Sequence, residues 1–299
     1  MQGCSHIQCK TACTLVKGGF PYHWDLNVYR GCSHDCKYCY ARYSHNYLQE
    51  KGSFNQKIFV KSNIAEALEK QLRSPKWDRS VINLGGVTDN YQSAESVEKQ
   101  MPEILRLMIQ YNNPIIISTK SDLILRDFDL IDALSRKTYV NIASTITTAD
   151  EYLQRKVEPG AVSPERRFFM LKEFGKTKAS TAVHMMPLMP YLTDGEENIE
   201  RVFAQAKESG VHYLLAGFLY LRGETKQVFY NFLKKEYPHL SIEYNRLYQK
   251  GEVNDYRKVV FQRLSKARRK YKISADYKSR LDKEVFGKNE PIQLTLFDT

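Results

Sequence analysis

Short runs of apolar, often β-branched residues recur along the first 220 residues of the chain, separated by stretches with helical spacing. The runs predict six β-strands, at residues 26–29, 81–84, 114–118, 140–146, 180–188 and 212–221. Apolar residues three and four positions apart predict helices at 63–73 and 95–110. Two further helices are expected to begin at Ser163–Pro164, an N-cap followed by a first-turn proline, and at Asp194–Gly195.

The alternation of strands and helices predicts an α/β fold with parallel strands joined by right-handed crossovers. Six strands are fewer than a closed eight-stranded barrel needs, so the residues alone allow an open sheet or a partly closed barrel. Both arrangements gather functional residues at the C-terminal ends of the strands, where the connecting loops converge. Cys32, Cys36 and Cys39 follow the first predicted strand and therefore belong to that edge.

The composition shifts toward charge and tyrosine after residue 222. Residues 254–272 have apolar positions every three or four residues among many Lys and Arg, which predicts a basic amphipathic helix. The formal net charge is +11, and most of the excess lies after residue 220. Clustered cations gain free energy by displacing counterions from phosphates, so nucleic acid, DNA above all, is the expected partner. The alternative is a solvated basic face.

These changes divide the chain into four expected parts. They are an N-terminal cysteine-containing segment (1–24), a main α/β unit (25–222), a basic helical extension (223–286) and a flexible tail (287–299). No apolar run reaches the ~20 residues that span a bilayer, and the first ten residues lack the apolar stretch of a secretion signal. We therefore expect a soluble, cytoplasmic protein without a membrane partner.

All six cysteines lie in the first 39 residues, which is not the distribution of a disulfide framework. In a reducing compartment such grouping indicates metal binding or catalysis. Cys32, Cys36 and Cys39 place three thiolates on one short loop. Three thiolates can hold a four-iron cluster in which one iron lacks a protein ligand, and radical S-adenosylmethionine (SAM) enzymes use such an iron to chelate SAM.

Two other interpretations of these thiols remain open from the residues alone. Zinc could take the three thiolates together with His34, although no second pair of ligands follows later in the chain. Cys36 and Cys39 could instead form a redox dithiol, which would leave Cys32 without a role.

The residues around the cysteines resemble a known family. Residues 27–42, NVYRGCSHDCKYCYAR, are similar to the cluster loop of the spore photoproduct lyase-like radical SAM proteins, often described as DNA repair photolyases. The likeness continues, in the family's order, through residues 86–92, 119–121, 126–127, 144–148, 157–160 and 163–167. It covers roughly residues 25–220 and implies a partial (β/α)6 TIM-like radical SAM barrel, to which the basic helical extension is added.

The resemblance also implies cofactors and residue roles. A [4Fe–4S] cluster on the three cysteines would cleave SAM reductively and generate a 5′-deoxyadenosyl radical, with a flavodoxin or ferredoxin as electron donor. The SAM-contacting candidates are Tyr38 for the adenine, Gly85, Gly86 and Thr88 for the amino group, Ser144 and Thr145 for the ribose or carboxylate, Lys120 or Arg167 for charge, and Met186 for an apolar wall. Structural roles are the alternative: a tight turn for the glycines, the core for Met186 and Met189, and an ion pair with Glu158 for Arg167.

Tyr38 and Tyr40 match the catalytic tyrosine pair of true spore photoproduct lyases, which work with a separate cysteine as hydrogen donor. This chain has no cysteine after Cys39. Unless an N-terminal cysteine reaches the barrel, that donor is missing, and lysis of the spore photoproduct itself is not expected. The N-terminal thiols either bind a second cluster or metal or are incidental; they are Cys4, Cys9 and Cys13.

The favoured hypothesis is a radical SAM enzyme that repairs or modifies a nucleic-acid base. The first alternative is a radical SAM enzyme acting on RNA, a peptide or a small molecule. A second alternative, from a different class, is a non-enzymatic DNA-binding or clamp-adaptor protein with a structural metal. The substrate, the source of the returned hydrogen atom and the oligomeric state are beyond the sequence.

The tail carries a short apolar motif. Gln293–Phe297 resembles the peptide by which bacterial replication and repair proteins bind the DNA sliding clamp. A polar anchor followed by two or three apolar residues on a hydrophilic tail is suited to a preformed groove. The alternative is that Leu294, Leu296 and Phe297 pack on the protein's own surface.

We predict that a labelled peptide covering Glu290–Thr299 binds a purified bacterial sliding clamp with micromolar affinity, about −8 kcal/mol. Changing Leu296 and Phe297 to alanine should abolish binding, because apolar anchors supply most of the free energy at such grooves. Fluorescence anisotropy measures both peptides. Equal binding of the two peptides, or none by either, contradicts the prediction.

Overall fold

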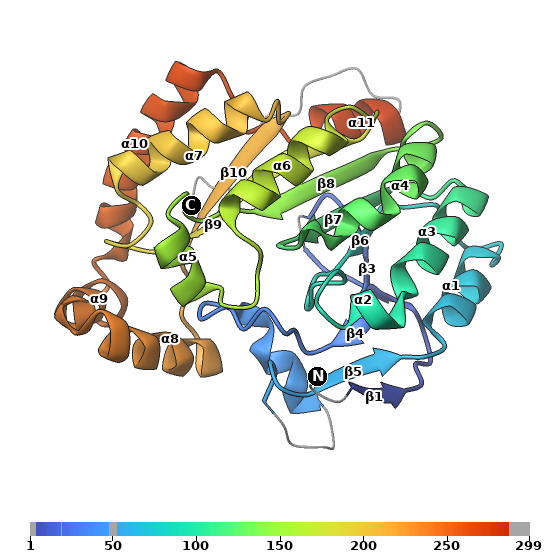
Figure 1. The fold of residues 1–299 in the computed structure, drawn as a ribbon, viewed down its shortest axis with the longest axis horizontal. Helices are drawn as coiled ribbons and strands as arrows, with labels where there is room; N and C mark the ends of the chain where they lie inside the picture. Colours follow the sequence, from blue (N-terminus) through green and yellow to red (C-terminus); the bar gives the residue numbers. More distant parts are fainter. Residues whose placement is uncertain (1–3, 19, 48–52, 287–299) are drawn as a thin grey trace.

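The computed structural model describes residues 4–18, 20–47 and 53–286. Its centre is a seven-stranded sheet in the order β10-β9-β8-β7-β6-β3-β2 (Figure 1). The antiparallel edge strand is β2 (Cys13–Leu15). The other strands run parallel to one another, as the sequence predicts; they are β3 (Trp24–Leu26), β6 (Ile82–Leu84), β7 (Ile115–Thr119), β8 (Val140–Thr145), β9 (Ser180–Leu188) and β10 (Tyr213–Phe218).

A second sheet of three strands has the order β1-β5-β4, with β1 at Cys4–Ile7, β5 at Ile58–Lys61 and β4 at Tyr29–Arg30. The strand that the sequence predicts at 26–29 is therefore divided between β3 and β4. The N–H group of Val28 donates to the side chain of Asn90 at 3.2 Å instead of to a neighbouring strand. The ladder between β3 and β6 accordingly ends at Leu26.

One face of the large sheet is covered by helices. They are α1 (Ile64–Leu72), α3 (Gln100–Tyr111), α4 (Phe128–Ser135), α6 (Pro164–Phe174) and α7 (Glu196–Glu208). The expected helix starts are confirmed: the Ser163 hydroxyl caps α6, and Gly195 is the N-cap of α7.

The helix predicted at 95–110 is interrupted. A short α2 (Glu95–Glu98) ends at Lys99, which has a left-handed backbone with φ 50°, and α3 follows. The carboxylate of Glu95 accepts hydrogen bonds from the N–H groups of Gln100 and Met101, each at 3.0 Å. This buried cap satisfies the first donors of α3, which is the physical reason for the break.

Side chains alternate between the two faces of the strands. Leu26, Ile117 and Val183 belong to the large apolar core under the helices. The alternate positions of the strands point to the opposite face, here called the inner face, and several of these are polar: Asp25, Asn83, Ser118, Thr145 and His184. A polar inner face is unusual for a buried parallel sheet and marks it as a binding surface.

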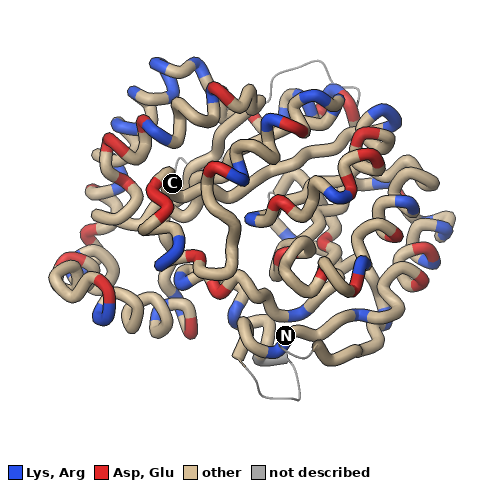
Figure 2. The backbone as a smooth tube through the Cα atoms, viewed as in Figure 1, with Lys and Arg blue, Asp and Glu red and all other residues tan. Residues whose placement is uncertain are grey.

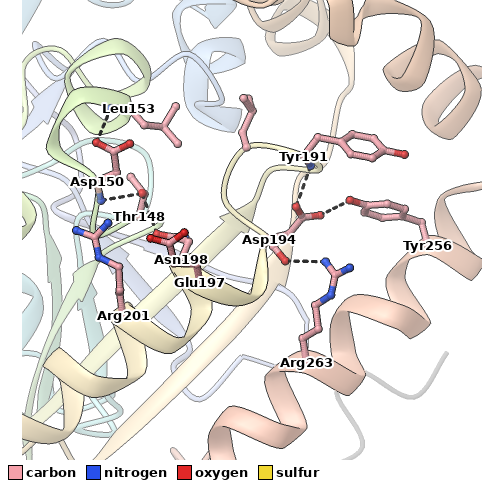
Figure 3. Close-up of a pocket in the computed structure, with 12 residues that line it drawn as sticks. Thr148, Asp150, Leu153, Tyr191, Asp194, Glu197, Asn198, Arg201, Tyr256 and Arg263 are labelled. Carbon is pink, nitrogen blue, oxygen red and sulfur yellow. Dashed lines mark hydrogen bonds between the residues drawn. The ribbon is translucent and has the colours of Figure 1, made fainter.

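The C-terminal region is helical, with α8 (Gly223–Glu236), η3 (Pro238–Leu240), α9 (Ser241–Gln249), α10 (Val253–Tyr271) and α11 (Ser279–Phe286). α10 confirms the basic helix predicted at 254–272 and packs along α7. Figure 3 shows two of the contacts: Tyr256 donates its hydroxyl to the Asp194 carboxylate at 2.6 Å, and Arg263 donates to the Asp194 carbonyl at 3.1 Å. α11 returns to the inner face, where Leu281 packs with Val81, Ile116 and Tyr139.

Both α7 and α10 carry charges of both signs (Figure 2), and lysines of α10 pair with glutamates of α7. Lys266 pairs with Glu196, and Lys270 pairs with Glu200 at 2.5 Å. Among the described residues, no helix is long and apolar enough to span a bilayer.

We predict that Leu264→Ala lowers the free energy of unfolding by about 2–5 kcal/mol. Leu264 lies on the buried face of α10, within the large core, and its truncation leaves a cavity. Urea denaturation measures the change. Val259→Ala, on the exposed side of the same helix, is the control and should cost less than about 0.5 kcal/mol. Equal effects of the two variants would mean that α10 does not share the core.

Candidate functional site

The three predicted ligand cysteines lie on a loop that connects β4 to η1 (Tyr40–Tyr47) and is held by backbone hydrogen bonds. The N–H of Cys32 donates to Phe54 O at 3.0 Å, that of Lys37 to Val157 O at 2.9 Å, and that of Cys39 to Cys36 O at 3.2 Å. All three thiols are free. The loop therefore presents three unbonded sulfurs from a fixed backbone.

The carboxylate of Asp89 joins this loop to the end of β7. It accepts from His34 Nε2 at 2.9 Å, from the Thr119 hydroxyl at 2.8 Å and from the Lys120 N–H at 2.8 Å. Burial opposes ionisation, but the charge and hydrogen bond of His34 and the N–H of Lys120 outweigh it and lower the pKa of Asp89. The group is thus an ionised buried carboxylate whose oxygens are fully used.

These contacts bear on the alternative that His34 completes a zinc site. Both ring nitrogens of His34 face protein acceptors, Asp89 and the Gly160 carbonyl at 2.8 Å, so His34 is not free to complete a zinc site. Within the described ranges, no three His, Cys, Asp or Glu side chains converge on a single ion. Burial raises the pKa of Cys36 and of Cys39. A cluster, which spreads its cysteine ligands over different irons, remains compatible with this donor set.

Glycine is required where the loop meets α5 (Glu151–Val157) and the turn after it. A Cβ atom on Gly160 would lie 2.3 Å from Ser33 O and 2.7 Å from His34 Cα. The N–H of Gly160 donates to His34 O at 3.0 Å. The close approach of these two backbone segments therefore explains why position 160 is a glycine.

Tyr38, which lies between the second and third cysteines, begins a buried chain of side chains. Its hydroxyl donates to Glu158, whose carboxylate pairs with Arg167 at 2.6 Å, and both partners are fully buried. Arg167 also donates to the carbonyl groups of Val162 at 2.8 Å and Thr145 at 2.7 Å. Its remaining terminal nitrogen, Nη2, has no partner among the described residues. The structural alternative of an Arg167–Glu158 pair is therefore present.

Lys120 is the second cation near Tyr38. Its ammonium nitrogen lies 6.0 Å from the centre of the Tyr38 ring. Unlike Arg167, it forms no ion pair with a carboxylate in the described part of the chain. Lys120 is therefore the better candidate to pair with an anionic group bound beside the loop.

The predicted residues at the end of β6 lie next to the cysteine loop. Gly85 has φ +100°, which favours glycine, and Gly86 donates its N–H to Asp25 at 3.1 Å. The Thr88 hydroxyl donates to Gly31 O at 2.5 Å, so it supports the loop. The hydroxyl of Tyr40, whose ring is exposed, donates to the carbonyl of Gly86.

The other predicted residues lie at the ends of β8 and β9. The Ser144 hydroxyl is fully buried and donates to Thr119 O at 2.7 Å, which is an internal role. Thr145 is partly exposed and shares its sheet position with His184. Met186 is partly exposed and packs on Gly217. The structure thus brings Thr145 and Met186 to the inner face, and turns Ser144 away from it.

Two inner-face residues were missed by the sequence analysis. Burial, and then the charge of Lys120, lower the pKa of His184 to about 4, so its imidazole is neutral near pH 7. Asp25 accepts from Asn27 and Asn83 at 2.7 and 2.8 Å as well as from Gly86. The signal for His184 was a polar residue inside the predicted strand 180–188, whereas Asp25 lies one residue before the predicted strand 26–29.

The N-terminal cysteines belong to the helix-side core or pack against it. Cys13 pairs with Leu26 across β2 and β3 and is buried in the helix-side core. Cys4 and Cys9 pack against the edge of that core. Burial raises the pKa of Cys13 to about 12.

A cavity of about 410 Å³ lies between α7, α10 and residues 148–153 (Figure 3), and its lining residue Leu153 packs in the same apolar cluster as Cys36 and Tyr38. It is lined by both signs of charge, including Asp150, Glu197, Arg201 and Arg263, and by none of the site residues that the sequence predicts. The candidate site is therefore the loop and the adjoining inner face.

We predict that Gly160→Ala displaces the cysteine loop, because its added Cβ overlaps the backbone of Ser33. The expected cost is about 1–3 kcal/mol of unfolding free energy, with faster alkylation of Cys32, Cys36 and Cys39 in the purified protein. Gly195→Ala, where nothing lies within 4 Å of the new Cβ, is the control and should leave the alkylation rates unchanged. Equal rates in the two variants would contradict the close approach.

Comparison with known proteins agrees with this geometry. A family model described as the Radical SAM superfamily matches residues 26–203. An uncharacterized protein of Mycobacterium tuberculosis is 32% identical over 297 residues, which cover 97% of this chain and 87% of the relative. One of Methanocaldococcus jannaschii is 29% identical over 216 residues, covering 71% and 76%.

Solved structures of spore photoproduct lyase share the fold. The lyase complexed with dinucleoside spore photoproduct aligns with a TM-score of 0.59 at 14% identity, over 79% of this chain and 66% of the lyase. A mutant of the lyase gives 0.59 at 15% identity with the same coverage. The chain thus spans slightly less than two thirds of that enzyme. The likeness confirms the expected partial TIM-like barrel.

The family model covers more than half of the chain and includes the cysteine loop, the Asp89 turn and the strand ends that meet them. This protein belongs to the radical SAM superfamily and is an enzyme of that class, with the fold of spore photoproduct lyase.

Proposed function

We propose that Cys32, Cys36 and Cys39 hold a [4Fe–4S] cluster and that the enzyme acts on a nucleic-acid base. The observation that carries the cluster assignment is the fixed loop with three free thiols at the C-terminal edge of the parallel sheet. That edge is where α/β enzymes of this kind place their chemistry. When bound, the cluster supplies one electron for cleavage of SAM to methionine and a 5′-deoxyadenosyl radical.

Different residues near the loop would contact different parts of SAM. Tyr38 is locked by Glu158, so its ring offers a fixed surface to the adenine. Lys120 is the counter-charge for the carboxylate, since the charge of Arg167 is already neutralised by Glu158. Gly85 and Gly86 let the end of β6 approach the amino group, and Thr145 and Met186 border the same space. Ser144 contributes by fixing the end of β7.

The inner face favours a polar, hydrogen-bonding substrate. Neutral His184, Asn83 and Ser118 point to this face, and a nucleobase presents matching donors and acceptors on its edges. The lyase with the same fold was solved with a dinucleoside lesion, which supports a nucleic-acid substrate here as well. A base that is damaged or already unpaired is the easiest to reach, so repair or base modification fits best.

Cleavage of the spore photoproduct itself is not part of the proposal. Among the described cysteines outside the loop, Cys13 points to the helix side of the sheet, and none lies on the inner face. The hydrogen atom returned to the product must therefore come from another group, and Tyr40, exposed next to Cys39, is the candidate.

Several expectations remain predictions. The clamp-binding motif, Gln293–Phe297, lies outside the described residues. Three other expectations have only the sequence as support: reduction by a flavodoxin or ferredoxin, a cytoplasmic location, and a second cluster on Cys4, Cys9 and Cys13. Superfamily membership favours an enzyme over the non-enzymatic adaptor. RNA, a peptide or a small molecule is the alternative substrate.

We predict that Cys32→Ala, Cys36→Ala and Cys39→Ala each abolish the brown absorbance of anaerobically reconstituted protein, because every thiolate ligates a cluster that is already one ligand short. Cys9→Ala is the control and should retain both absorbance and iron. Iron analysis and visible spectra measure the effect. Full iron content in any of the three loop variants would contradict the assignment of that cysteine as a cluster ligand.

A further inference from the structure

The cations of the predicted basic helix are largely engaged within the protein. Lys266 and Lys270 pair with Glu196 and Glu200 on α7. Arg268 donates to the carbonyl groups of Ile273 and Leu214, both at 3.1 Å. Phosphate contacts by these side chains would compete with existing partners, so α10 is not the best nucleic-acid surface.

The start of α8 is different. Arg222 and Lys226 lie one helical turn apart, and neither pairs with a carboxylate in the described part of the chain. The Arg222 guanidinium lies 4.7 Å from the centre of the Tyr220 ring, and the ring is 54% exposed. Lys226 lies 5.9 Å from the Tyr230 ring. We call Tyr220, Arg222 and Lys226 the α8 patch.

The α8 patch lies directly beside the cysteine loop. Leu219 and Leu221 pack in the same apolar cluster as Cys36 and Tyr38, whereas Tyr220 between them is exposed. The Thr225 hydroxyl, in the first turn of α8, donates to Cys39 O at 2.8 Å. A strand held on the patch would therefore run past the site in which the chemistry is proposed.

We propose that the α8 patch binds single-stranded nucleic acid, with Tyr220 stacking an unpaired base while Arg222 and Lys226 contact the flanking phosphates. The inference rests on the proposed function and names the form of its substrate. An exposed ring next to unpaired cations is the combination that single-strand binding uses, because stacking tolerates any sequence and the cations follow the backbone. The net charge of +11 complements such a strand. A duplex keeps its bases paired and offers no ring face to Tyr220.

The test is fluorescence anisotropy of the full chain with a labelled single-stranded DNA, repeated over a series of salt concentrations. Tyr220→Ala should weaken binding by about 5- to 150-fold with an unchanged salt slope, because stacking releases no counterions. Arg222→Ala and Lys226→Ala should each flatten the slope by about one unit. Two controls should resemble the wild type: Phe169→Ala, an exposed ring with Arg166 at 5.5 Å on α6, and Lys270→Ala, whose cation is paired.

Three results would overturn the proposal: Tyr220→Ala behaving like Phe169→Ala, equally tight binding of a duplex of the same sequence, or no oligonucleotide binding by wild-type protein that cleaves SAM. The last result leaves the radical chemistry intact and assigns the substrate to another class, such as a peptide. Conversely, the expected pattern of binding in a protein that fails to cleave SAM supports the patch and refutes the proposed chemistry.

Discussion

The carboxylate of Asp89 ties the cysteine loop to the parallel sheet. It receives hydrogen bonds from His34 in the loop and from Thr119 and Lys120 at the end of β7, while Asp89 itself belongs to the turn after β6. The donors therefore come from the cysteine loop and from the end of β7, and the acceptor comes from a third segment at the same edge of the sheet. Since a buried carboxylate is tolerated only when its oxygens are satisfied, folding of these segments is coupled.

A second buried group completes the support from the other side. Glu158 accepts from Tyr38 and pairs with Arg167, which also binds the end of β8 through Thr145 O. Losing either partner of a buried pair costs about 3–5 kcal/mol, because the other charge is left uncompensated. The two networks explain why the segments that resemble the family occur far apart in sequence: they are the connections that meet around the loop.

Much of this arrangement was predictable from the sequence. The parallel strands, four helix starts and the basic helix follow from spacing and capping residues, which act locally. The break at Lys99 was not predictable. It depends on the Glu95 side chain, which accepts hydrogen bonds from the first N–H groups of α3. The roles of Thr88 and Ser144 were also beyond reach, since their hydroxyl groups are used by carbonyls of neighbouring segments. Likewise, the charge of residues 254–272 was visible in the sequence, but its neutralisation by α7 was not.

Cys39 links the proposed cluster to the proposed strand-binding patch, because its carbonyl group accepts a hydrogen bond from Thr225 in the first turn of α8. The central claim is that this loop carries a cluster that cleaves SAM. The most direct measurement is the amount of 5′-deoxyadenosine formed when anaerobically reconstituted wild-type protein is reduced with dithionite in the presence of SAM. We expect about four irons per chain and formation of 5′-deoxyadenosine that depends on the reductant. A colourless protein with bound zinc, or an iron-loaded protein that leaves SAM intact, would contradict it.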